Sequence, residues 1–309
     1  MKTHLHWRDL PPDARGATVA LGNFDGVHLG HASIIRTAAA AVDAPLGVVT
    51  FEPHPRERFA PDAPPFRLMN PEARANRLAR LNVDHLYELP FDAELAGLTP
   101  HEFAAQVLCA GLGVVHVTVG EDFRFGKDRA GDAATLTALG QTLGFGVTIA
   151  PLVGRDGQDF SSTAIRTALA EGDPRGAAQM LGHWHRIEGE VIHGEKRGRE
   201  LGYPTANMSV DRLHLPKLGV YAVLVNVLTG PLAGEYHGVA SLGVRPMFGE
   251  NQPNLEVHLF DFDGDLYGQH LSIALVDYLR PEMRFDGLPA LIEQMDRDSQ
   301  AARAILSGL

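Results

Sequence analysis

Two histidines near the start of the chain stand where a phosphate group could bind. In the segment Gly22-Asn-Phe-Asp-Gly-Val-His28-Leu-Gly-His31, an apolar run ends and an alanine-rich helical pattern begins. A helix N-terminus carries unpaired N–H groups and the positive end of the helix dipole, so anions bind there. His28 and His31 are three residues apart, so both imidazoles share one face. The alternative is a tight glycine turn with two surface histidines, but the position between a strand and a helix favours the phosphate site.

Two further segments carry groups that suit the same site. His54 follows the second apolar run within Phe51-Glu-Pro-His54-Pro55, where the prolines are expected to fix an exposed His54. The segment Ser161-Ser-Thr-Ala-Ile-Arg166 begins a helical pattern, and its first hydroxyls could cap that helix and do nothing more. Thr163 and Arg166 share one face of it, and an arginine there can clamp phosphate with two hydrogen bonds.

A glycine- and charge-rich loop at residues 120–132 contains Asp122 and Arg129. It superficially resembles the phosphate-binding loop of P-loop enzymes. Its glycines, however, are six residues apart, and Asp128 follows Lys127 where serine or threonine is required. The P-loop interpretation is therefore rejected.

The second half carries a different glycine-rich segment at residues 189–207, with basic residues among the glycines. Flexible turns with nearby donors suit a triphosphate, whereas the alternative is a long hairpin with a solvated charge run. Neither an H-R-D element nor a Walker motif occurs, and the Asp261-Phe-Asp-Gly264 segment is interpreted as a turn. A fold of the protein-kinase type is therefore excluded.

The elements that must position the first set of residues follow an alternating pattern. In such α/β sheets, ligands bind beyond the carboxyl ends of the strands. Strands alternating with helical patterns predict a parallel sheet with helices on both faces, an α/β fold. The expected strands are residues 17–21, 46–51, 83–89, 114–119 and 146–150.

Strands dominate after residue 182, where we place the boundary between domains 1–182 and 183–309. Closely spaced strands followed by one helix predict a small antiparallel β-barrel with a packed C-terminal helix. That helix is expected at 286–306, with Asp286 as its N-cap and an apolar stripe that starts at Leu288. The expected strands are residues 186–192, 219–228, 236–242, 255–260 and 271–279.

Composition narrows the function classes further. The 309 residues carry a formal net charge of −11, from 27 Lys and Arg against 38 Asp and Glu. Nonspecific nucleic-acid binding depends on neutralising many phosphates with Lys and Arg, so that class is not expected. A single cysteine, Cys109, cannot form an intrachain disulfide. Without a signal-peptide pattern or a long apolar stretch, the protein is expected in the cytoplasm and away from membranes.

The segments G-N-F-D-G-V-H-L-G-H, T-F-E-P-H-P, G-E-D-F-R-F-G and S-S-T-A-I-R together resemble the adenylyltransferase module of bacterial bifunctional riboflavin kinase/FAD synthetases. The resemblance implies a Rossmann-like nucleotidyltransferase domain in which His28 and His31 stabilise ATP phosphates while FMN phosphate attacks the α-phosphorus. It implies no general base, because the attacking phosphate is already ionised, and it places His54 at the flavin. Residues implied at ATP are Gly22, Asn23, Asp25, Gly30, Asp122, Arg129, Ser161, Ser162, Thr163 and Arg166.

The segments P-T-A-N (204–207), G-V-Y-A-V (219–223), G-V-A-S-L-G-V-R-P (238–246) and N-L-E-V-H-L (254–259) resemble the riboflavin kinase module of the same family. By this resemblance, Thr205 and Asn207 ligate Mg²⁺, which prefers oxygen. Glu256 would be the general base on the ribityl 5′-hydroxyl, and strand alternation points it away from the aliphatic face; the alternative is an ordinary strand carboxylate. Residues implied at ATP are Gly194, Lys196 and Gly198, and those implied at flavin are Arg245 and Arg280.

Three residues of the kinase module, Ser241, Met247 and Arg280, limit what the resemblance implies. Family members usually carry asparagine at Ser241 and threonine at Met247, which puts flavin affinity or loop packing in doubt and leaves the reaction intact. Arg280 could instead stabilise the junction with the C-terminal helix.

The expected function is phosphorylation of riboflavin to FMN and adenylylation of FMN to FAD, with Mg²⁺ as cofactor. The expected partners are riboflavin, FMN and ATP, with no obligate protein partner. Two alternatives remain: an enzyme with one activity only, or a flavin-binding protein without turnover. Intact His28, His31 and Arg166 argue against the first, and intact Glu256 argues against the second.

Overall fold

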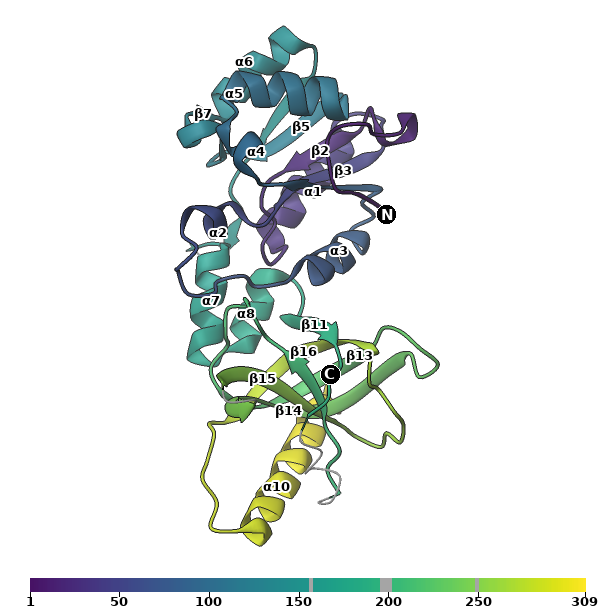
Figure 1. Ribbon diagram of the computed structural model, residues 1–309, viewed down its shortest axis with the longest axis vertical. Helices are drawn as coiled ribbons and strands as arrows, with labels where there is room; N and C mark the ends of the chain where they lie inside the picture. The colour runs from purple at the N-terminus through teal and green to yellow at the C-terminus, as the bar shows by residue number, and fades with distance from the viewer. Residues whose placement is uncertain (156–157, 195–201, 248–249) are drawn as a thin grey trace. The chain divides into compact units, whose positions relative to one another are not determined.

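The computed structural model describes residues 1–155, 158–194, 202–247 and 250–309 (Figure 1). By their internal contacts these residues form two compact units. The first unit contains Met1–Ala63 and Arg74–Phe160, and the second contains Pro64–Ala73 and Ser161–Leu309. A short segment from the first half of the sequence therefore belongs to the second unit. A division into functional domains between residues 182 and 183 stays a prediction.

The first unit is built on a parallel sheet, as predicted, but the sheet has six strands because the unpredicted strand β1 (Lys2–His4) joins its edge. Its strands are β1 (Lys2–His4), β2 (Thr18–Leu21), β3 (Leu46–Glu52), β4 (His85–Pro90), β5 (His116–Gly120) and β8 (Gly146–Ala150). Their order is β1-β4-β3-β2-β5-β8. The order reverses at β2, which lies between β3 and β5, and ligands of open α/β sheets bind at such a switch point.

The inner strands β4, β3, β2 and β5 are mostly buried because helices cover a parallel sheet on both faces, whereas the edge strands β1 and β8 are more exposed. Helix α1 (Leu29–Ala41) places Ala32, Ile35 and Ala38 on its buried face, the spacing expected of an amphipathic helix. The other helices of this half are η1 (Pro12–Ala14), α2 (Pro55–Phe59), α3 (Pro71–Ala79), α4 (Ala93–Gly97), α5 (Pro100–Glu102), η2 (Phe103–Leu112), η3 (Lys127–Arg129) and α6 (Ala133–Leu143). Two short hairpins pair β6 (Arg124–Phe125) with β7 (Gly131–Asp132), and β9 (Gly154–Arg155) with β10 (Gln158–Asp159).

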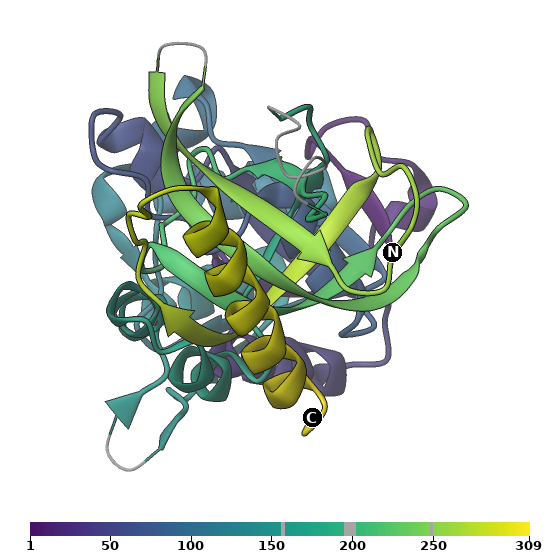
Figure 2. The same ribbon diagram turned by 90° about the horizontal axis from the view of Figure 1, so that it is seen from below.

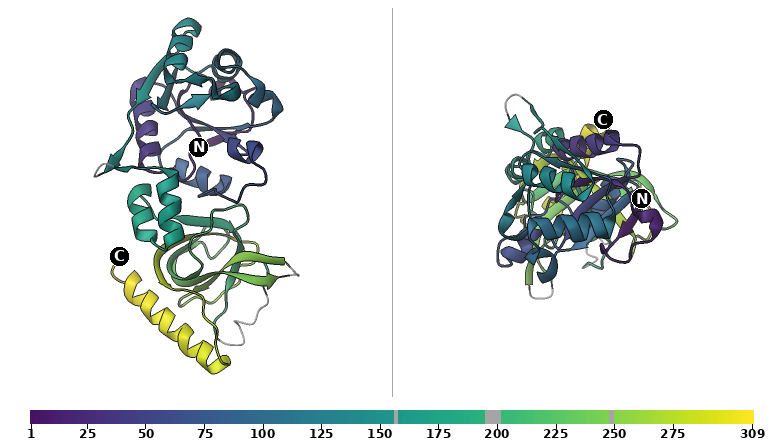
Figure 3. Two further views of the ribbon diagram at one scale, coloured as in Figure 1. Left: turned by 90° about the vertical axis from the view of Figure 1, so that its left-hand side faces the viewer. Right: turned by 90° about the horizontal axis from the view of Figure 1, so that it is seen from above.

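The second unit contains a six-stranded antiparallel sheet that curves into a nearly closed barrel, as predicted (Figure 3). Its strands are β11 (Arg186–Glu190), β12 (Ala206–Ser209), β13 (Gly219–Val227), β14 (Gly234–Met247), β15 (Glu250–Leu259) and β16 (His270–Arg280). Their order is β11-β16-β13-β14-β15-β12. Ile192, just after β11, pairs with Asn207 of β12, so the two ends of the sheet meet. Strand β12 was not predicted, because it is short and lies within the glycine-rich segment.

The C-terminal helix α10 (Leu288–Leu306) lies across the outside of the barrel (Figure 2). Ala302 and Leu306 pack there against Ala222, Phe260 and Val276. The prediction of Asp286 as N-cap was wrong: the N-cap is Gly287, whose φ of 103° lies in the region that glycine tolerates. The predicted apolar stripe was also wrong at its start, because Leu288 is 57% exposed.

Helices α7 (Ser162–Glu171) and α8 (Pro174–Leu181) join the segment 64–73 in the second unit. Leu68 is fully buried in a cluster with Ile165, Leu169 and Leu181. Two polar contacts add to this packing: Asn70 donates to the carbonyl of Glu188 at 2.8 Å, and the His270 Nδ1 lies 2.8 Å from the Glu72 carboxylate. Packing therefore assigns this segment to the barrel's unit, although its sequence neighbours form the other one.

Candidate nucleotide and flavin sites

The loop between β2 and α1 has an unusual backbone. Phe24 and Val27 have positive φ angles of 52° and 42°, and Gly26 between them has a φ of 88°. Positive φ is uncommon for any residue with a side chain and is a genuine outlier for a β-branched one such as valine. Both side chains are fully buried, so packing holds the loop in this conformation. Backbone held in such regions clusters at ligand-binding sites.

His28 and His31 lie against one another at the start of α1. Their ring centroids are 3.7 Å apart with 23° between the planes. His28 is the N-cap, and its Nδ1 accepts a hydrogen bond from the His31 backbone N–H at 3.3 Å. An accepting Nδ1 places the proton of a neutral imidazole on Nε2, which makes that atom a donor. A Cβ at Gly30 would lie 3.0 Å from the His28 ring, so glycine permits this close packing.

His31 is suited to receive an anion. Burial, and then the electrostatic interaction with neighbouring His28, lowers the pKa of His31 well below its usual value, so the ring is neutral near pH 7. Within the part of the chain that the structure describes, its buried Nδ1 has no hydrogen-bond partner. A buried nitrogen without a partner costs free energy, and a phosphate oxygen would supply one. The predicted histidine pair is therefore brought together in a form that can bind phosphate.

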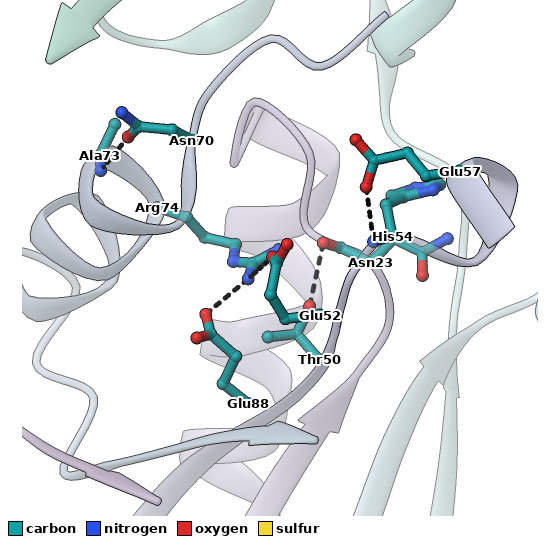
Figure 4. Close-up of polar contacts among 9 residues, drawn as sticks. All are labelled: Asn23, Thr50, Glu52, His54, Glu57, Asn70, Ala73, Arg74 and Glu88. Atoms are coloured by element: carbon teal, nitrogen blue, oxygen red, sulfur yellow. Dashed lines mark hydrogen bonds and ion pairs between the residues drawn. The ribbon is translucent and has the colours of Figure 1, made fainter. Parts of the chain in front are cut away.

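The predicted acidic and basic residues of the first unit lie at different depths. Asp25 is only 6% exposed within the β2–α1 loop. Asp122 is exposed just after β5, the strand that flanks β2 at the switch point. Arg129 is exposed at the end of η3. Asn23 lies at the start of the same loop as Asp25, and its carbonyl accepts a hydrogen bond from the Thr50 hydroxyl of β3 at 3.0 Å (Figure 4).

His54 begins the short helix α2, directly after β3. Its Nδ1 accepts from the Arg56 backbone N–H at 3.1 Å, and its own backbone N–H donates to the Glu57 carboxylate at 3.0 Å (Figure 4). The side chain is half-buried rather than fully exposed, because this reciprocal cap holds it against the helix start. A contact between His54 and flavin stays a prediction.

Sequence reasoning missed an aromatic surface beside His54. Phe59, the last residue of α2, is 70% exposed. Its ring meets Phe91 edge-on with centroids 5.8 Å apart, and Phe91 meets Phe51 at 5.7 Å. The signal in the sequence was only a phenylalanine five residues after His54, which does not indicate exposure. The exposed Phe59 ring, packed against Phe91, offers an apolar face to a planar ring.

The predicted phosphate-binding residues of α7 lie in the second unit. Ser161 is the N-cap, and its hydroxyl accepts from the Ala164 N–H at 3.2 Å. Ser162 is the first residue of the helix, and Thr163 is exposed. The Arg166 Nε donates to the carbonyl of Phe66 at 2.5 Å. Whether these residues meet the histidines of the first unit stays a prediction.

In the barrel, the predicted kinase residues form one group on adjoining strands. Asn207 of β12 lies directly opposite Glu256 of β15, and Ser241 of β14 lies opposite Glu256 on its other side. Asn254 donates to the Asn207 Oδ1 at 3.3 Å and to Glu256 at 3.4 Å. Leu255 and Val257 are fully buried while Glu256 is partly exposed, so the predicted alternation is confirmed. The amide of Asn254 was missed, although it stands two residues before Glu256.

Gly194 lies close to the same group. A Cβ there would be 2.4 Å from the Asn207 Nδ2, so only glycine lets the chain pass at this point. Lys196 and Gly198 lie outside the described residues, and the side chains of Arg245 and Met247 are likewise outside the description. Their roles stay predictions.

A pocket of about 440 Å³ opens beside Thr205. Its lining combines acidic side chains from the loop after β15 with apolar side chains from that loop and from the barrel. The lining residues are Val191, Pro204, Thr205, Ala206, Leu259, Phe262, Asp263, Gly264, Asp265, Leu266 and Tyr267. This mixture of apolar walls and a few polar groups is typical of small-molecule sites.

Arg280 lies at the end of β16 and contacts α10. Its Nη2 and Nε both bond to the buried carboxylate of Asp298, at 2.7 and 2.9 Å. This two-point ion pair is the contact expected if Arg280 stabilises the helix junction. A contact between Arg280 and flavin stays a prediction.

The barrel group has the chemistry of a magnesium site. Thr205, Asn207 and Glu256 offer a hydroxyl, an amide carbonyl and a carboxylate, the oxygen ligands that Mg²⁺ prefers. Among the described residues, no cluster of three or more His, Cys, Asp or Glu side chains could hold a metal by itself. Mg²⁺ usually completes its shell with water and substrate phosphates, so the residues present fit a metal that arrives with ATP.

Comparison with known proteins finds two families along the chain. Residues 10–164 match a model of FAD synthetase, and residues 181–306 match a model of riboflavin kinase. A bifunctional riboflavin kinase/FMN adenylyltransferase of Pseudomonas fluorescens is 43% identical over 96% of this chain and 95% of its own length. The protein of the same name from Escherichia coli K12 is 40% identical over 93% and 92%.

A solved structure extends the likeness to three dimensions. A protein from Streptococcus pneumoniae, described as a macrolide-efflux protein, is 32% identical with a TM-score of 0.83, and the match covers 98% of both chains. In the part of this chain that the structure describes, no helix combines the length and apolar character that crossing a bilayer demands. The two family models and the full-length relatives lead to one conclusion: this chain belongs to the bifunctional riboflavin kinase/FMN adenylyltransferase family.

Proposed function

We propose that this enzyme transfers a phosphoryl group from ATP to riboflavin in the barrel and an adenylyl group from a second ATP to the resulting FMN in the first unit. The products are FMN and ADP, then FAD and pyrophosphate. The observation that carries the proposal is the presence of two different sets of groups: stacked imidazoles at a helix start in one unit, and oxygen ligands beside a carboxylate in the other.

In the adenylyl transfer, His28 and His31 act by charge stabilisation. The neutral rings donate hydrogen bonds to phosphate oxygens at the positive end of α1, where negative charge develops as the FMN phosphate oxygen attacks the α-phosphorus. Gly22, Asn23, Asp25 and Gly30 shape the loop around the phosphates. Asp122, Arg129, Ser161, Ser162, Thr163 and Arg166 are proposed to complete the nucleotide site. The attacking phosphate is already ionised, so no residue needs to remove a proton.

In the phosphoryl transfer, Glu256 accepts the proton of the ribityl 5′-hydroxyl as that oxygen attacks the γ-phosphorus of ATP. Enzymes of the two matched families generally need a divalent metal, and we assign Mg²⁺, held by Thr205 and Asn207 against the ATP phosphates. This ion would neutralise charge on the transferred phosphate. Gly194, Lys196 and Gly198 are proposed to cover the triphosphate.

Flavin binding is proposed at both sites. In the first unit, the exposed Phe59 ring beside His54 supplies a face on which the isoalloxazine ring can stack. In the barrel, Arg245 and Arg280 are the proposed flavin contacts. Riboflavin, FMN and ATP are the only partners that the proposal requires, and the proposed compartment is the cytoplasm.

The test is chromatographic separation of flavins after the purified protein is incubated with riboflavin, ATP and Mg²⁺. The proposal expects FMN first and FAD later. Formation of only one product would restrict the protein to one reaction. Unchanged riboflavin, together with FMN that stays unconverted when supplied directly, would overturn the proposal.

A further inference from the structure

A buried ion triad lies at the carboxyl ends of β3 and β4 (Figure 4). The Nη2 of Arg74 donates to Glu52, the last residue of β3, at 3.0 Å and to Glu88 of β4 at 2.6 Å. The Arg74 side chain is 4% exposed, that of Glu88 12% and that of Glu52 29%. The proposed catalytic mechanism uses none of these three residues.

The triad is connected to both loops of the proposed adenylyltransferase site. Glu52 is followed by Pro53 and His54, so its position fixes where the His54 loop leaves the sheet. Two residues earlier on the same face of β3, the Thr50 hydroxyl donates to the carbonyl of Asn23 in the phosphate loop. The ends of β2, β3 and β4 are therefore joined by side-chain contacts at the ligand-binding edge of the sheet.

The charge of the triad matters because this edge must accept anions. The three side chains together, two carboxylates and one guanidinium, carry a net charge of −1, and removing the guanidinium makes their sum one unit more negative. Like charges that face each other weaken binding, and FMN brings a phosphate to this site. Within the described residues, the buried Arg74 Nε has no hydrogen-bond partner. Hydrogen bonding alone therefore does not explain why an arginine is buried at this position.

We propose that Arg74 is a positioning residue for FMN in adenylyl transfer: it neutralises the strand-end carboxylates and holds Glu52 back from the incoming phosphate. This inference rests on the proposed function of the first unit. It concerns KM for FMN rather than the chemical step, because Arg74 is buried and is assigned no contact with the reacting atoms.

The experiment measures KM for FMN and kcat of FAD formation with the full chain, using the wild type and the variants R74M, R74K, R74M/E88Q and E88Q. R74M is expected to raise KM for FMN by about tenfold while kcat changes less than about threefold, from added like charge. R74K keeps the charge and should stay within about threefold of wild type. R74M/E88Q returns the net charge to −1 and should recover most of the loss.

The E88Q variant separates an effect of charge from an effect of misfolding, because Arg74 retains its bond to Glu52. Its triad is neutral, so KM for FMN should fall, whereas a purely structural role for the triad predicts a rise. High salt should narrow the gap between R74M and wild type, since screening weakens charge repulsion. Riboflavin phosphorylation by the same preparations serves as the control and should not change.

An unchanged KM for FMN in R74M, or a double variant no better than the single one, would overturn the inference. So would a rise in KM for E88Q. Absence of FAD formation by the wild type is a different result, because it would overturn the proposed function itself.

Discussion

The two proposed sites would bind phosphate with different chemical groups, hydrogen-bond donors in one and oxygen ligands for a metal ion in the other. In the first unit, the groups are backbone N–H donors and two neutral imidazoles at the start of α1, and the half-buried His31 has a lowered pKa. In the barrel, the groups are the proposed oxygen ligands Thr205, just before β12, and Asn207 on β12, with the Glu256 carboxylate of β15 directly opposite Asn207. The first set suits an anion directly, while the second suits an anion through a metal ion.

The difference follows from the nucleophile in each reaction. An FMN phosphate is ionised before it attacks, so the first site needs only orientation and charge stabilisation. A ribityl hydroxyl must lose a proton, so the second site needs a base as well. The comparison teaches that each proposed site needs a different set of groups for its own nucleophile, and each activity should therefore fail independently of the other.

The largest difference between the two activities is expected when the proposed general base, Glu256, is removed. Glu256→Gln keeps the shape of the side chain but cannot accept the proton, so kcat of riboflavin phosphorylation should fall by about 10³-fold, within the usual range for general bases. FAD formation from supplied FMN should persist at the wild-type rate. Both rates are measured by flavin chromatography on one preparation, and an equal loss of both would contradict separate sites.

The reciprocal experiment removes the imidazoles. The double change His28→Ala and His31→Ala deletes two donors to the developing charge and should lower FAD formation by about 10² or more. Riboflavin phosphorylation should be unaffected. Because His28 also caps α1, the single change His28→Asn, which retains a capping group, separates loss of the cap from loss of the donor. If phosphorylation fell in parallel, the assignment of this loop to adenylyl transfer would be wrong.

Much of this arrangement could be predicted from the sequence, and the exceptions have physical reasons. Strand and helix patterns predicted both sheets, and short spacing predicted that His28 and His31 would meet. The triad around Arg74 was not predicted, because its partners come from two strands and an arginine in a helical pattern resembles a surface residue. The placement of segment 64–73 was missed for a similar reason: the packing of Leu68 depends on residues about a hundred positions away.

Acid should reveal a further difference between the two units. Burial, followed by the charges of His183 and His214, lowers the pKa of His185 in the barrel unit from 6.5 to about 3. The unfolded chain takes up this proton near pH 6.5 and the folded chain does not, so the stabilisation is present above pH 6.5 and is lost as pH falls towards 3. At 1.36 kcal/mol per pH unit, the loss by pH 5 is about 2 kcal/mol.

The chain has two tryptophans, Trp7 in the first unit and Trp184 in the second, so Trp7→Phe leaves a fluorescence signal from the barrel unit alone. In this background, urea unfolding of the wild type and of His185→Gln is compared at pH 7.5 and pH 5. The variant should lose about 2 kcal/mol less than its parent over this interval. Saturating ATP should leave this difference unchanged, because no ligand is assigned to His185. His31, in contrast, is assigned to the ATP phosphates. Equal losses in both proteins would contradict the assignment of this pH dependence to His185.

The smallest effect is expected from a change that tests whether Gly194 holds the Asn207 side chain in position. Gly194→Ala places a Cβ 2.4 Å from the Asn207 Nδ2, so the amide must move and the proposed metal ligand moves with it. Riboflavin phosphorylation should fall by about tenfold, chiefly through a higher requirement for Mg²⁺, because ligand orientation tunes metal affinity. Gly189→Ala is the matched control on the same barrel, since its nearest neighbour would be 3.9 Å away. FAD formation should be the same in both variants. If the two alanine variants phosphorylated riboflavin equally well, Asn207 would not be held in place by this close approach, and its assignment as a metal ligand would lose its geometric basis.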